Sequence, residues 1–137
     1  MMMGAYALRG NWEDNTYMNK QRKTEIKAEI DGLRALRKAM RAEPRTPEAL
    51  AKELEVYQKR ITAIHDKEQD EFDKMSEKQQ CSTAGEIAEE SIALLEDAMD
   101  YMDELVMDVK DSEELDLSEI GYSMEDVIDL LSDIINM

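Results

Sequence analysis

The stretch Glu43-Pro44-Arg45-Thr46-Pro47 separates two long amphipathic segments, and this break decides the fold. Pro44 cannot continue a helix, and it also disfavours a helical conformation at Glu43. Thr46 is a favourable N-cap, and Pro47 suits the first helical position, where its missing N–H costs no hydrogen bond. One helix therefore ends at this stretch and another begins within it. Two helices joined by so short a turn are expected to form an antiparallel hairpin.

Apolar side chains recur at helical spacing on both sides of the break. The helix before it is predicted over residues 19–42, and the helix after it from Pro47 to about Lys78. The first stripe comprises Ile26, Ile30, Leu33, Leu36 and Met40, and the other faces of that helix carry Lys20, Arg22, Lys23, Lys27, Arg34, Arg37, Lys38 and Arg41. The second stripe comprises Leu50, Leu54, Tyr57, Ile61, Ile64, Phe72 and Met75, with a gap at Glu68 where the helix is expected to bend or change partner. Residues 18–78 are thus expected to form a basic to neutral hairpin.

The acidic residues 83–137 are expected to add further helices. Thr83, with Glu86 three residues later, reads as a capping box that starts a helix with an unusually wide apolar face. A polar turn over residues 76–82 precedes this helix. The sequence therefore predicts an all-α fold, a helical hairpin extended to a three- to four-helix bundle.

The last helix is expected to follow an acidic connector. The connector is predicted from Asp111 to Gly121, and Ser123 is expected to open the helix. Five Gly and two Pro in 137 residues are too few for the turns of an all-β fold, in agreement with this assignment. Residues 18–137 are expected to form a single helical domain.

Residues 1–17 differ from the rest because they lack helical periodicity and contain Gly4, Gly10 and the single Trp12. They are expected to be a translated leader or a flexible tail. In the leader interpretation, Met18 is the authentic start of the protein.

The net charge of −16 is unevenly distributed. Residues 1–67 hold 14 Lys and Arg against 10 Asp and Glu, a net charge of +4, whereas residues 68–137 hold 3 Lys against 23 Asp and Glu, a net charge of −20. The negative electric field of residues 68–137 repels nucleic acid and attracts basic protein surfaces, so a cationic protein partner is expected and direct nucleic-acid binding is not.

A single cysteine, Cys81, and the absence of a membrane-spanning apolar run or a signal-peptide pattern favour a cytoplasmic protein with no membrane association.

The stretch from Asp66 to Leu105 contains Glu68-Gln69-Asp70-Glu71-Phe72-Asp73-Lys74-Met75, then Gln80, Ser82 and Gly85-Glu86. It resembles small acidic helical proteins of phages and prophages of gut bacteria. The resemblance covers under a third of the chain, and this chain has Ser76 where those proteins have a proline in the turn. It implies a phage origin, and by analogy a role like that of anti-CRISPR proteins, which disable host nucleases.

Residues that could carry enzymatic chemistry are few. His65 has no second His or Cys pair to complete a zinc site, and the segment 108–119 fails as a calcium loop because Lys110 and Glu113 occupy positions that need a ligand and a glycine. An alternative is an all-α Mg-dependent nucleoside-triphosphate pyrophosphatase, with Glu68-x-x-Glu71 and Glu86-x-x-Glu89 as its metal-binding pairs. We expect no enzymatic activity and no cofactor or metal.

The acidic third helix is the candidate partner-binding surface. Its carboxylates crowd one face, and like charges at i,i+4 spacing cost about 0.2–0.5 kcal/mol each, a cost that a cationic partner would offset. The candidate site residues are Glu96, Asp97, Asp100, Asp103, Glu104 and Asp108, with Met99, Met102 and Met107 as adaptable contacts.

The function expected from this surface is inhibition by occlusion: it docks on a basic nucleic-acid-binding groove of a host defence nuclease, such as a CRISPR complex. Internal neutralisation by the basic first helix, or a face that only maintains solubility, are the alternatives for the acidic surface itself. A structural or scaffold phage protein that forms a homodimer is a further alternative for the whole chain.

Overall fold

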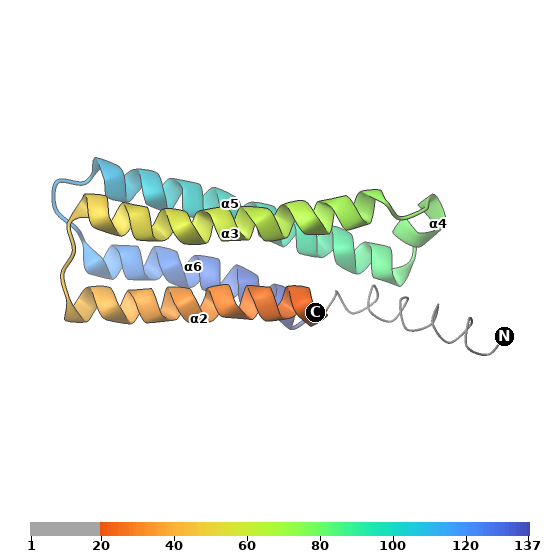
Figure 1. Cartoon of the computed structure of the whole chain (residues 1–137), viewed down its shortest axis with the longest axis horizontal. Coiled ribbons are helices and arrows are strands. Elements are labelled where there is room, and N and C mark those ends of the chain that lie inside the picture. The colour runs from red at the N-terminus through yellow and green to blue at the C-terminus, as the bar shows by residue number, and fades with distance from the viewer. Residues whose placement is uncertain (1–19) are drawn as a thin grey trace.

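The computed structural model describes residues 20–137, which form five helices and no strand (Figure 1). The helices are α2 (Lys20–Ala42), α3 (Pro47–Asp73), α4 (Glu77–Gln80), α5 (Thr83–Asp111) and α6 (Leu117–Ile135). The four long helices run alternately in opposite directions, and α4 is a short turn at the α3–α5 end (Figure 1). The all-α bundle expected from the sequence is confirmed. The expectations for residues 1–17 and for a start at Met18 lie outside the described residues.

The four long helices pack in a ring. α5 lies between α3 and α6, α2 lies between α6 and α3, and the α2–α3 contact is the slightest of the four. α2 and α5 are therefore diagonal neighbours across the core. No described helix has an apolar stretch of the length needed to cross a bilayer.

The core is aliphatic and is built from the predicted stripes. All five residues of the first stripe are buried, as are Leu50, Leu54, Ile61 and Ile64 of the second. The buried side chains of α5 form a wide apolar face because this helix packs against both α3 and α6, which confirms the wide face that its sequence predicts.

The break between α2 and α3 follows the predicted chemistry. Thr46 is the N-cap of α3, its Oγ1 accepts a hydrogen bond of 3.1 Å from the Ala49 N–H, and Pro47 is the first helical residue. At the other end, α3 stops at Asp73 instead of continuing to Lys78, because Ser76 caps a separate short helix, α4, in which Gln79 completes a capping box. The polar turn predicted over residues 76–82 thus contains a single helical turn.

Two helix starts also differ from their predicted positions. The N-cap of α5 is Ser82, whose Oγ accepts from the Gly85 N–H, and not Thr83. α6 begins at Leu117, capped by the Asp116 carboxylate, six residues before Ser123. In both cases the side chain that accepts a hydrogen bond from a free backbone N–H lies upstream of the residue predicted to be the N-cap.

Candidate functional site

The solvent-facing side of α5 is lined by carboxylates along its whole length. All ten acidic residues of this helix are exposed, and at 3.6 residues per turn they occupy less than half of its circumference. We call this set the acidic face: Glu86, Glu89, Glu90, Glu96, Asp97, Asp100, Asp103, Glu104, Asp108 and Asp111. The six acidic residues predicted as partner-binding all belong to it, so the structure brings them together on one side.

The three methionines assigned to the same surface occupy different environments. Met107 is 62% exposed and lies within the acidic face, whereas Met99 is half-buried against the core. Met102 is fully buried, so its assignment as a surface contact was wrong. It lies one turn from Ala98 and Leu105, which both face the core. Tyr101, which was not among the predicted contacts, is 47% exposed at the edge of the acidic face.

The acidic face has almost no internal counter-charge. The one cation of α5, Lys110, lies 2.9 Å from Glu55 on α3. Among residues 20–137, two carboxylates of the face contact a polar group of α3: Glu96 lies 3.4 Å from His65 Nε2, and Asp103 accepts a hydrogen bond from Gln58. None forms an ion pair with a Lys or Arg in this part of the chain. His65 is thus a residue of the α3–α5 interface, with Nδ1 3.1 Å from Asp66.

Two cations of α2, Arg37 and Arg41, lie beside α6 instead. Arg37 forms an ion pair with Glu125 of α6. A Cβ atom added at Gly121 of α6 would lie 3.3 Å from Arg41 Nη2 and 3.7 Å from Arg37 Cδ, so these two side chains cover that flank of α6. Neutralisation of the acidic third helix by the basic first helix is therefore not what the structure shows, because the two helices are diagonal across the bundle.

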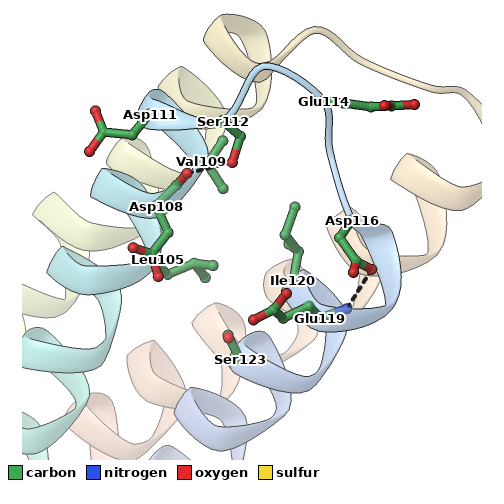
Figure 2. Close-up of a pocket in the computed structure, with 10 residues that line it drawn as sticks. All are labelled: Leu105, Asp108, Val109, Asp111, Ser112, Glu114, Asp116, Glu119, Ile120 and Ser123. Carbon is green, nitrogen blue, oxygen red and sulfur yellow. Dashed lines mark hydrogen bonds between the residues drawn. The ribbon is translucent and has the colours of Figure 1, made fainter.

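The acidic face ends in a hollow at the turn between α5 and α6 (Figure 2). This acidic notch has a volume of about 450 Å³ and is lined by five carboxylates and no cation: Asp108, Asp111, Glu114, Asp116 and Glu119. Its remaining lining is Leu105, Val109, Ser112, Ile120 and Ser123. The Asp116 carboxylate accepts a hydrogen bond from the Glu119 N–H at 3.2 Å, and Ser112 Oγ donates to the Asp108 carbonyl oxygen at 2.6 Å. The notch continues the negative surface of α5 around the end of the bundle.

The two Glu pairs considered for a pyrophosphatase lie in different surroundings. Glu68 and Glu71 both accept hydrogen bonds from the guanidinium of Arg22, at 2.7 and 2.8 Å. Glu86 and Glu89 are exposed on the outer side of α5. In residues 20–137 no three His, Cys, Asp or Glu side chains are grouped so as to hold a metal ion.

The Arg22–Glu68 contact was not predicted from the sequence. Arg22 was expected on a face of its helix outside the apolar stripe, but it is 5% exposed, and Glu68 is 4% exposed. Burial raises the pKa of the Glu68 carboxyl to about 7 against the opposing effect of Arg22. The gap in the second stripe at Glu68, and the position of Arg22 four residues before Ile26 of the first stripe, were the signals that could have located this pair.

Comparison with protein-family models, with curated proteins and with solved structures gives no match to this chain.

Proposed function

We propose that the chain is a non-enzymatic inhibitor of phage type that acts in the bacterial cytoplasm. In this proposal the acidic face of α5 binds a cationic groove of a host nucleic-acid-processing complex, such as a defence nuclease, and blocks access to it. The observation that carries the proposal is that ten carboxylates share one exposed face and none is paired with a Lys or Arg in residues 20–137. An external cationic surface would supply the missing counter-charge.

The charge density of the face supports this choice of partner. From Glu86 to Asp111 the helix rises by roughly 38 Å at 1.5 Å per residue, so ten carboxylates give about one charge per 4 Å. One strand of B-form DNA carries one phosphate per roughly 3.4 Å of axis. A protein groove that tracks a phosphate backbone therefore meets a similar linear density of negative charge on α5.

Two exposed apolar side chains add contact area to this electrostatic surface. Met107 lies among the carboxylates and Tyr101 lies at their edge. Aromatic and Met side chains are enriched where proteins meet, and a Tyr ring stacks readily on an arginine guanidinium. Residues of this type favour a protein partner over a purely solvated surface.

The test uses matched charge changes on two helices. Asp97→Asn, Asp100→Asn and Glu104→Gln together remove three charges from α5, and Asp126→Asn, Asp129→Asn and Asp133→Asn remove three from α6. Each full-length chain is immobilised and exposed to a nuclease-treated bacterial lysate at low and high salt. We expect wild type and the α6 triple variant to retain the same partner at low salt, and the α5 triple variant to lose it by at least about tenfold.

The captured partner is then tested for nucleic-acid binding. A labelled DNA duplex, or an RNA if the partner prefers one, should be displaced from it by wild type and by the α6 triple variant, but not by the α5 triple variant. Capture that is insensitive to salt would contradict the proposal, because salt screens electrostatic binding. Equal losses in both triple variants would also contradict it, because the binding is assigned to α5 alone.

A further inference from the structure

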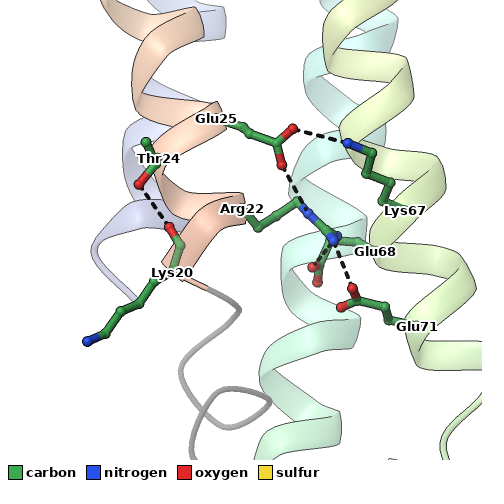
Figure 3. A network of polar contacts seen from close by, with 7 residues as sticks. All are labelled: Lys20, Arg22, Thr24, Glu25, Lys67, Glu68 and Glu71. Atoms are coloured by element: carbon green, nitrogen blue, oxygen red, sulfur yellow. Dashed lines mark hydrogen bonds and ion pairs between the residues drawn. The ribbon is translucent and has the colours of Figure 1, made fainter. Parts of the chain in front are cut away.

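A group of charges around the buried Arg22 and Glu68 joins the first turns of α2 to the last turns of α3 (Figure 3). The Arg22 guanidinium lies between Glu68 and Glu71, and its Nε is 3.5 Å from Glu25. Lys67 completes the group, with Nζ 3.1 Å from the second oxygen of Glu25. We call these five side chains the ionic clasp. It lies at one end of the α2–α3 contact, which is the slightest helix–helix contact of the ring.

The clasp has an odd number of charges. Arg22 and Lys67 contribute two positive charges, and Glu25, Glu68 and Glu71 contribute three negative charges when all are ionised. The group becomes neutral when one carboxyl binds a proton. Glu68 is the carboxyl for which ionisation costs most, since its side chain is 5% exposed whereas that of Glu25 is 30% and that of Glu71 is 44% exposed.

We propose that the ionic clasp is a proton-controlled latch: a proton on Glu68 holds the start of the basic helix α2 against α3, and loss of that proton loosens it. This device is independent of the proposed function. The pKa of Glu68, raised by burial to about 7, places the change at neutral pH.

The other charged groups near the clasp include one carboxyl, Glu29, whose pKa shifts in the same direction as that of Glu68. On α2, Glu29 is also buried; burial raises its pKa, against the opposing effect of Arg60. Lys20 extends away from the cluster (Figure 3). On α5, the buried side chains near Glu96 include Ser91, Ile92 and Leu95, and Glu96 contacts His65, one turn before Glu68. The last acidic side chain of α6 is Asp133, and the helix ends at Ile135.

The sign of the pH effect follows from the direction of the shift. The Glu68 pKa lies near 7 when the clasp is closed and returns towards 4.5 when α2 opens and water reaches the carboxyl. The closed state therefore holds more protons between these values, and closure weakens as pH rises through them. From these two pKa values, opening of the start of α2 should increase about 70-fold between about pH 5 and about pH 8, and change little above that.

Amide hydrogen exchange of the full chain measures this opening directly. Exchange of the backbone amides of residues 24–30, corrected for the intrinsic effect of pH, should rise by several tens-fold in wild type across this range. Glu68→Gln mimics the protonated side chain and should abolish most of the increase. Glu48→Gln, at an exposed carboxyl of α3 outside the clasp, should retain it, and amides in the middle of α5 serve as an internal reference.

A direct titration covers the case in which Glu68→Gln does not fold. The carboxyl carbon of Glu68 in wild type, followed by NMR, should titrate with a midpoint near 7. A midpoint near the ordinary value for Glu, or an exchange rate at the start of α2 that stays constant with pH or keeps its full slope in Glu68→Gln, would overturn the proposal.

Discussion

Lys110 Nζ of α5 lies 2.9 Å from Glu55 Oε1 of α3, so the one cation of α5 serves the α3–α5 interface and not the acidic face. The hydrogen bond and the positive charge of Lys110 lower the pKa of the Glu55 carboxyl. This arrangement leaves the carboxylates of α5 to repel one another. Partner binding and the stability of the free protein are therefore expected to respond in opposite ways to these charges. The face that is proposed to bind a partner is also a face that destabilises the free protein.

Asp100→Asn should therefore stabilise the free chain. Asp100 has carboxylates three or four residues away on both sides: Glu96, Asp97, Asp103 and Glu104. Removing one charge from this row should raise the free energy of unfolding by about 0.5–1 kcal/mol at low salt, and by less at high salt, where the repulsion is screened. Urea unfolding at two salt concentrations measures both effects. An equal or lower stability at low salt would show that the face is not under electrostatic repulsion.

Arg22→Met should be strongly destabilising, because it leaves the Glu68 carboxyl buried without its cation. A cost of about 3 kcal/mol is expected, since breaking a buried ion pair from one side leaves an uncompensated polar group. Replacing both partners, Arg22→Met with Glu68→Leu, should recover most of that loss. Chemical denaturation of wild type, the two single variants and the double variant completes the cycle. A double variant as unstable as Arg22→Met alone would mean that the ionic pair is not the source of the effect.

Gly85→Ala should destabilise the α4–α5 corner. A Cβ atom at this position would overlap the backbone carbonyl groups of Gln79 and Gln80, which cannot move without breaking the turn. The expected loss is about 2–3 kcal/mol. Gly121→Ala is the matched control, because its Cβ would meet only the flexible end of Arg41 and the stem of Arg37. Thermal unfolding should show it unchanged, or stabilised by up to about 1 kcal/mol from the gain in helix propensity.

Asp116→Ala tests where α6 begins. The Asp116 carboxylate accepts from the Glu119 N–H, and its loss should cost about 1 kcal/mol. Ser123→Ala, at the residue that the sequence favoured as the start, should cost less than about 0.5 kcal/mol because Ser123 lies inside the helix. Equal losses in the two variants would favour the later start.

The sequence predicted the helices and the core well because both depend on local periodicity. Proline placement located the α2–α3 turn, and the apolar stripes of α2 and α3 are largely buried as predicted. Helix starts were less predictable. At Ser82 and Asp116 an upstream side chain caps the helix, and several nearby Ser, Thr and Asp residues offered similar signals.

Features that depend on which helices are neighbours could not be predicted from the sequence pattern of a single helix. The sequence placed ten carboxylates on α5 and a row of cations on α2, but it could not say that these helices lie diagonally across the bundle. The burial of Met102 also depends on neighbouring helices, because Met102 lies on an apolar side of α5 that is covered only since α5 packs against two helices. Arg22 and Glu68 meet across 46 residues of sequence, so neither could be recognised as half of a pair within its own helix.

The most direct test of the central claim is the affinity of the captured partner for the α5 triple variant (Asp97→Asn, Asp100→Asn, Glu104→Gln) relative to the α6 triple variant (Asp126→Asn, Asp129→Asn, Asp133→Asn). Both carry the same net charge, so only the location of the negative charge differs. If the acidic face of α5 is the binding surface, the dissociation constant rises by at least about tenfold for the α5 variant and much less for the α6 variant. Equal dissociation constants for the two variants would contradict the account.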